Sequence, residues 1–131
     1  MNKNVSYSAV VLDEESRKKL IKVFWYLIPS NYEVIAHHMT IKLGGLEDGC
    51  QEKQDMEEGK KIHLNVVDYA MDDKVMAVGV KGYSSTNEKP HITIAVNRAN
   101  GGKPYLSNKL TDWRKIGFSF ELTGYVEEVT K

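Results

Sequence analysis

Apolar and polar residues alternate along most of this 131-residue chain, which is the period of strands that bury one face. Residues 61–69 are a clear case, with Ile62, Leu64 and Val66 on one face. Residues 13–28 differ, because their apolar positions recur every three or four residues and predict an amphipathic helix lying on a sheet. The expected elements, in chain order, are strand 5–12, helix 13–28, strand 32–43, strands 61–69 and 75–80 as an antiparallel hairpin, strand 91–97, a short helical turn at 109–113 and strand 116–129.

Residues with strong local preferences mark the boundaries of these elements. Asp13 is a favourable N-cap for the helix, and Pro29 ends it. Gly44 begins a polar loop that runs through Gly59. One helix among several strands predicts an α+β fold with a central antiparallel sheet, which we expect to form a single domain over residues 1–131.

The charge balance and the cysteine content narrow the class of protein. Lys plus Arg and Asp plus Glu both total 18, so the chain lacks the basic field that draws proteins onto long duplex nucleic acid. The single cysteine, Cys50, cannot form an internal disulfide, and residues 1–4 lead into a strand pattern instead of the apolar core of a signal peptide. No apolar run approaches the length that crosses a membrane. We expect a soluble, cytoplasmic protein that binds neither a membrane nor a long duplex.

One tetrapeptide pattern, histidine-apolar-threonine-isoleucine, occurs twice in the chain. It begins at His38 and again at His91, and each copy lies on a predicted strand. Because successive side chains of a strand point to opposite faces, His38 shares a face with Thr40, and His91 shares a face with Thr93. Each strand therefore offers an imidazole and a hydroxyl side by side.

This pair of half-sites is suited to breaking a phosphodiester. Imidazole titrates near pH ~6.5, so one histidine can remove a proton from the nucleophile while the other protonates the leaving oxygen. The hydroxyls of Thr40 and Thr93 can hold the non-bridging phosphate oxygens, where negative charge increases in the transition state. No metal or cofactor is required. The sequence leaves open which histidine is the acid and which is the base.

Two histidine-x-threonine strands in a small α+β chain resemble the two-histidine (2H) phosphoesterase superfamily. The resemblance rests on His38, Thr40, His91 and Thr93, and it implies that the motifs lie on neighbouring central strands of a sheet with a concave groove and an outer packing helix. Its members include cyclic phosphodiesterases that act on RNA ends, tRNA-ligase end-healing domains and phage enzymes that cleave cyclic nucleotide signals. The motif spacing is short for the superfamily and one helix is evident, so the resemblance implies a trimmed second lobe.

Residues around the motifs are candidates for substrate binding. Lys42 lies two residues beyond the first motif threonine, on the same predicted face, and can add positive charge to a phosphate. Tyr83 and Tyr105 lie in predicted loops that flank the second motif and can stack on a base. Lys89 and Arg98 bracket that motif and can attract phosphate, although cations at strand ends more often serve solubility.

The remaining histidines and the cysteine have simpler interpretations. Strand alternation places His37 on the face opposite His38, which predicts a structural residue. His63 lacks a threonine partner and is predicted to be a strand residue with a local hydrogen bond. Adjacent histidines diverge on a strand and Cys50 lies in a separate loop, which argues against a zinc site. No histidine lies near Cys50 in the sequence, which argues against a cysteine nucleophile.

The sequence thus predicts a metal-independent phosphodiesterase that hydrolyses a nucleotide or RNA-end phosphodiester, with a 2′,3′-cyclic phosphate at an RNA 3′ end or on a nucleotide as the expected substrate. Two alternatives remain open at this stage. One is cleavage of cyclic oligonucleotide signalling molecules by the same site, and the other is a non-catalytic module that binds RNA or nucleotides. The sequence does not indicate the preferred base, the pathway or the oligomeric state.

Overall fold

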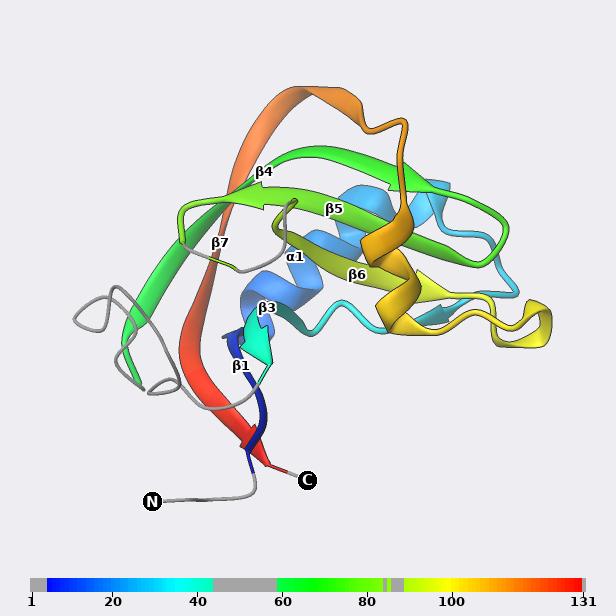
Figure 1. Cartoon of the computed structure of the whole chain (residues 1–131). Coiled ribbons are helices and arrows are strands. Elements are labelled where there is room, and N and C mark those ends of the chain that lie inside the picture. The colour runs from blue at the N-terminus through cyan, green and yellow to red at the C-terminus, as the bar shows by residue number, and fades with distance from the viewer. Residues whose placement is uncertain (1–4, 44–58, 84, 86–88, 131) are drawn as a thin grey trace.

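A seven-stranded antiparallel sheet dominates the structure, a computed structural model that describes residues 5–43, 59–83, 85 and 89–130. The strand order is β2-β6-β3-β1-β7-β4-β5, and β5 also pairs with β6, so the sheet closes on itself in a barrel-like form (Figure 1). The elements are β1 (Val5–Leu12), α1 (Glu14–Phe24), the 3-10 helix η1 (Trp25–Leu27), β2 (Glu33–Val34), β3 (His38–Leu43), β4 (Lys61–Met71), β5 (Val75–Lys81), β6 (His91–Val96), the 3-10 helices η3 (Arg98–Asn100) and η4 (Pro104–Lys109), and β7 (Arg114–Thr130).

The predicted α+β class and antiparallel sheet are confirmed, and so is the hairpin of β4 and β5. Its turn is held by Asp72, whose amide donates to the Val75 carbonyl at 3.0 Å. The Asp72 Oδ1 atom in turn accepts from the amides of Lys74 and Val75, at 2.9 and 3.0 Å. An aspartate that satisfies following backbone amides is a common local signal for such a turn.

The predicted helix forms with the expected N-cap but ends early. Asp13 Oδ1 accepts a hydrogen bond from the Ser16 amide at 2.8 Å. α1 ends at Phe24 instead of residue 28, where the chain tightens into η1. In this turn Trp25 is 64 % exposed, while Leu27 packs against the main core. Leu20 and Phe24 are buried in the main core.

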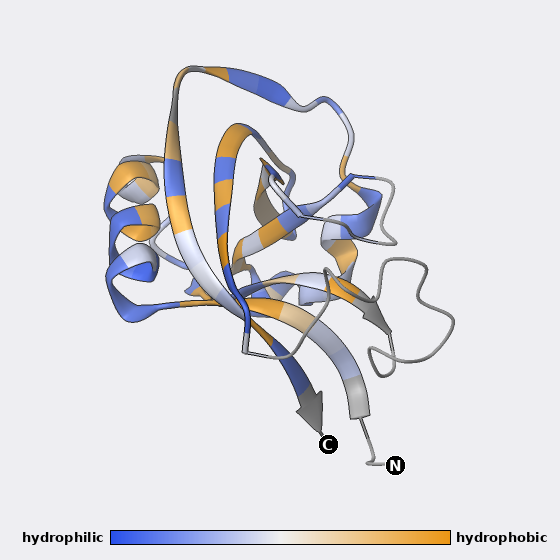
Figure 2. Cartoon of the chain, turned by 90° about the vertical axis from the view of Figure 1, so that its left-hand side faces the viewer, coloured by the Kyte–Doolittle hydropathy of each residue, from blue (hydrophilic) through white to orange (hydrophobic). Residues whose placement is uncertain are grey.

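The main core lies between α1 and the inner face of the sheet. It contains Met39 and Ile41 from β3 and Ile92 and Ile94 from β6, all fully buried. The opposite, outer face of β5 and β6 is covered by η4 and the segment after it, over a second apolar cluster of Ala70, Val75, Ala77, Val96 and Leu110. α1 and η4 accordingly lie on opposite sides of the sheet (Figure 2).

The expected long strand over residues 32–43 is wrong in its continuity. The chain forms two strands, β2 and β3, separated by residues 35–37, where Ala36 adopts a left-handed φ of 43°. The segment between β2 and β3 stays hydrogen-bonded to the sheet. The amides of Ile35 and Ala36 donate to the β6 carbonyls of Ile94 and Thr93 at 2.6 and 3.0 Å. β6 therefore organises both halves of this segment.

The helical turn predicted at residues 109–113 is also misplaced. The turn occurs earlier, as η4, with Pro104 at its start, where the fixed φ of proline favours helical backbone and its missing N–H costs nothing. Residues 110–113 are instead irregular and carry Leu110 and Trp113 onto the second apolar cluster.

Among the helices of the described ranges, none combines the length and the apolar character that a membrane span requires. The loop expected from Gly44 onward, with Cys50, lies outside the described residues, which resume at Gly59.

Candidate active site

The two histidine-threonine strands are direct neighbours in the sheet. β3 and β6 pair antiparallel, with Met39 opposite Ile92, and both of these side chains are fully buried on the inner face. One step on either side of this pair, the register puts His38 opposite Thr93 and Thr40 opposite His91. These four side chains, called here the His-Thr cluster, lie on the outer face, and diagonal neighbours in such a ladder have Cα atoms about 7–8 Å apart.

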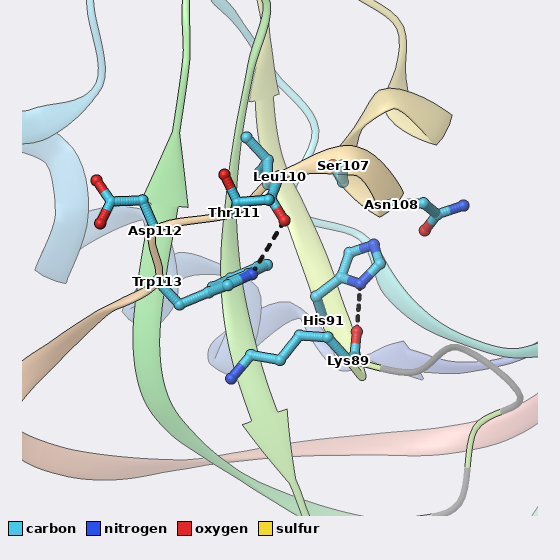
Figure 3. Close-up of a pocket in the computed structure, with 8 residues that line it drawn as sticks. All are labelled: Lys89, His91, Ser107, Asn108, Leu110, Thr111, Asp112 and Trp113. Carbon is cyan, nitrogen blue, oxygen red and sulfur yellow. Dashed lines mark hydrogen bonds between the residues drawn. The ribbon is translucent and has the colours of Figure 1, made fainter.

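His91 is held in one orientation by a backbone carbonyl. Its Nδ1 lies 2.7 Å from the carbonyl oxygen of Lys89, and because a carbonyl only accepts, Nδ1 carries the proton. The Nε2 atom is then left for proton transfer, and in Figure 3 it points toward the side of the pocket where Ser107 and Asn108 lie. Burial lowers the pKa of His91, the bond to the Lys89 carbonyl raises it, and the Lys89 charge lowers it further. His91 is 8 % exposed.

His38 has the more strongly perturbed imidazole. Burial, followed by the nearby charges of His37 and His91, lowers its pKa from 6.5 to about 4. The ring of Tyr7 from β1 stacks on it with centroids 5.0 Å apart. An unprotonated ring at neutral pH is the form that accepts a proton.

The interpretation of His37 as a residue facing away from His38 is wrong. The Nδ1 atoms of the two rings lie 3.0 Å apart, so one ring donates to the other. Strand alternation fails here because the break around Ala36 leaves His37 outside β3, where the period of two does not apply. The His37-His38 doublet was the available signal for this contact.

The two threonines differ in their surroundings. The Thr93 hydroxyl lies 2.7 Å from the Ser107 hydroxyl and 3.3 Å from the Pro104 carbonyl, both in η4. Thr40 sits beside residue 85, since its carbonyl accepts a hydrogen bond from the Ser85 hydroxyl at 2.8 Å. η4 therefore anchors one half of the cluster.

A pocket of about 470 Å³ opens beside His91 (Figure 3). It contains one of the two motif histidines, so a single groove shared by both stays a prediction. Its lining residues are Lys89, His91, Ser107, Asn108, Leu110, Thr111, Asp112 and Trp113.

The residues predicted to bind substrate lie in different environments. The Lys42 side chain lies outside the described residues. Tyr83 is partly buried and packs against the main core, whereas Tyr105 on η4 is 59 % exposed. Lys89 lines the pocket, and Arg98 pairs with Glu33 on the surface at 2.9 Å.

Sequence reasoning missed two residues near the pocket. Trp113 follows η4 and had no motif to mark it. Asp68 had a signal, because it occupies the phase of Ile62, Leu64 and Val66 in an alternating strand, where an acid is out of place. A bulge between Val66 and Asp68 turns this carboxylate out of the core.

His63 behaves as predicted, exposed on β4 and near Thr123 and Glu121 at 3.4 and 3.5 Å. Within the described part of the chain, no group of three or more histidines, cysteines or acids is placed to hold a metal ion.

Comparison with known families identifies a related domain. The family model described as the fungal tRNA ligase phosphodiesterase domain matches residues 33–128, a span that includes both histidine-threonine motifs. A search of curated proteins finds no match.

Proposed function

Because the chain belongs to the fungal tRNA ligase phosphodiesterase domain family, it is a phosphodiesterase of the 2H phosphoesterase superfamily, and we propose that it opens 2′,3′-cyclic phosphates at RNA 3′ ends. The observation that carries this proposal is the register of β3 and β6. With Met39 opposite Ile92, each histidine is set across from the threonine of the other strand. This crossed register supports the proposal that two imidazoles and two hydroxyls act on one phosphate.

His38 is assigned as the general base and His91 as the general acid. A pKa lowered to about 4 keeps His38 unprotonated at neutral pH, ready to take a proton from the attacking water. Burial and the Lys89 charge lower the pKa of His91. Its acid role therefore depends on the carbonyl at Nδ1 and on the negative phosphate of a bound substrate, both of which stabilise the imidazolium. Its Nε2–H then protonates the departing ribose oxygen as the ring P–O bond breaks.

Thr40 and Thr93 are assigned to the non-bridging oxygens. Charge increases on these oxygens as water adds to phosphorus, so a hydroxyl placed there stabilises the transition state more than the ground state. Without substrate, the Thr93 hydroxyl donates to the Pro104 carbonyl at 3.3 Å, so its proton must turn to a phosphate oxygen on binding. The Ser107 hydroxyl, 2.7 Å away, can then donate to the Thr93 oxygen.

The test is turnover of an RNA oligonucleotide with a 2′,3′-cyclic phosphate end, beside cyclic mononucleotides and cyclic di- and trinucleotides, all in EDTA. His38→Ala and His91→Ala should each lower kcat by about 100-fold or more while the protein stays folded. His63→Ala is the matched control, because this histidine is also on a strand but lies exposed on β4. Wild-type activity in both motif variants would reject the proposal.

The products discriminate the remaining possibilities. A 2′-phosphate or a 3′-phosphate identifies which ribose oxygen His91 protonates. Cleavage of the cyclic oligonucleotides alone would move the substrate to signalling molecules, and binding without product would indicate a module that has lost turnover.

A further inference from the structure

A partly buried ion pair lies next to His91, outside the His-Thr cluster. Lys89 Nζ donates to Asp68 Oδ2 at 2.6 Å, and the side chains of Lys89 and Asp68 are 39 % and 9 % exposed. The Lys89 ammonium also lies 4.9 Å from the ring centroid of Trp113. The pair joins β4 to the segment that enters β6, two parts of the chain that are 21 residues apart.

The ion pair depends on a glycine in the strand between. Asp68 is opposite Gly79 in the β4-β5 ladder, and Gly79 is opposite His91 in the β5-β6 ladder, so the three residues form one row across the sheet. A Cβ at Gly79 would overlap Asp68 Oδ1 and lie 2.8 Å from Lys89 Cε. The missing side chain thus leaves the space through which Lys89 crosses β5 to reach the carboxylate.

The same lysine supplies the carbonyl that fixes the His91 ring. Residue 89 precedes Pro90, which restricts its backbone to extended conformations, and the Pro90 carbonyl accepts from the Val80 amide at 3.1 Å. The ion pair and the Trp113 ring hold the other end of residue 89. Its carbonyl therefore has little freedom to leave Nδ1 of His91.

We propose that Asp68 and Lys89 are positioning residues for His91: their ion pair, seated over Gly79, locks the Lys89 carbonyl onto Nδ1 and keeps Nε2 directed at the substrate. The inference rests on the proposed function, since it assigns His91 a proton-transfer role. It also accounts for the Asp68 carboxylate, whose burial is costly and whose Oδ1 atom has no hydrogen-bond partner among the described residues.

The charged and titratable groups around His91 come from several elements. Lys89 precedes it, Asp68 faces it from β4 across Gly79, His38 lies diagonally on β3, and Asp112 lies on the wall of the pocket. Within this set, Lys89 is the residue whose carbonyl is bonded to the His91 ring, and Asp68 is the residue that pairs with its ammonium.

The primary measurement is the tautomer of His91 in the wild-type protein, read from imidazole nitrogen chemical shifts after ¹⁵N-histidine labelling and assigned with His91→Gln. A single neutral form with the proton on Nδ1 is expected. A mixture of tautomers, or a proton on Nε2, would overturn the proposal without any variant.

Asp68→Asn and Lys89→Met then test the ion pair, with Glu33→Gln as a control that breaks the exposed pair to Arg98. Each test variant should mix the His91 tautomers and lower kcat about tenfold or more, with KM within about threefold, because misoriented acids lose turnover before binding. The control should change neither. Folded test variants with the wild-type tautomer and kcat would refute the positioning role.

The double variant Asp68→Asn/Lys89→Met separates positioning from stability. Removing both charges relieves the uncompensated charge of either single variant, so thermal stability should recover, while the His91 tautomer and kcat should not. Recovery of all three would show a purely structural pair. If the wild type failed to turn over cyclic phosphates while the tautomer still responded, the substrate assignment would fall and the positioning role would stand.

Discussion

Protonation of His38 should cost the folded protein stability, because the ring is largely buried beside two other histidines. Burial, then the charges of His37 and His91, lower its pKa from 6.5 to about 4. The unfolded chain has no such environment, so its histidine titrates near the ordinary value. The difference ties folding to proton binding at this one side chain.

The sign of the effect follows from which state holds more protons. Between pH 6.5 and about 4, the unfolded state is protonated at His38 and the folded state is not, so the free energy of unfolding decreases as the pH falls. Below pH ~4 both states are protonated and the loss levels off. At ~1.36 kcal/mol for each pKa unit, the full loss is about 3 kcal/mol, of which about 2.5 kcal/mol is reached by pH ~4.5.

Urea unfolding of the wild type and of His38→Gln, between about pH 7.5 and pH 4.5, isolates this contribution. Glutamine keeps a polar side chain but cannot be protonated, so the wild type should lose about 2.5 kcal/mol more than the variant over this range. His63→Gln, on exposed β4, should keep the wild-type dependence. Equal slopes for wild type and His38→Gln would refute the reasoning that His38 is buried as an unprotonated ring.

Three other substitutions test the fold and the site. Gly79→Ala should lower the free energy of unfolding by about 1–3 kcal/mol in urea titrations, since the added methyl would overlap Asp68 Oδ1. Unchanged stability would mean that the Asp68 carboxylate does not occupy the space beside Gly79. Asp13→Ala should cost about 1 kcal/mol in thermal unfolding through loss of the bond from the Ser16 amide, while Asp13→Asn should be nearly neutral. Thr93→Ala should lower kcat about 10- to 100-fold, less than loss of either histidine, because one hydrogen bond to a charged oxygen is removed; an effect equal to a histidine variant would assign the hydroxyl a larger role.

The sequence alone determines the local features of this protein. Alternation correctly sent Met39 and Ile92 inward and their histidine and threonine neighbours outward, since side chains of a strand must alternate whatever surrounds them. The N-cap at Asp13 and the turn after β4 are local as well. In both, an aspartate side chain accepts hydrogen bonds from amides within three residues of it.

Other features depended on contacts between distant segments. The register of β3 on β6 is set by the packing of the whole inner face, and it decides that each histidine meets a threonine of the other strand. The break at Ala36, which brings His37 to His38, is held by carbonyls of β6. No local pattern encodes these hydrogen bonds.

The surroundings of His91 show most clearly which features are local and which depend on tertiary contacts. The sequence motif identifies His91 itself. Three separate segments supply its surroundings, namely the Asp68 carboxylate, the Lys89 ammonium and the Trp113 ring. They meet because β5 pairs with both β4 and β6 and carries Gly79 at their crossing. Closure of the sheet is a property of the whole chain, so the protonation state and orientation of this histidine are decided by tertiary structure.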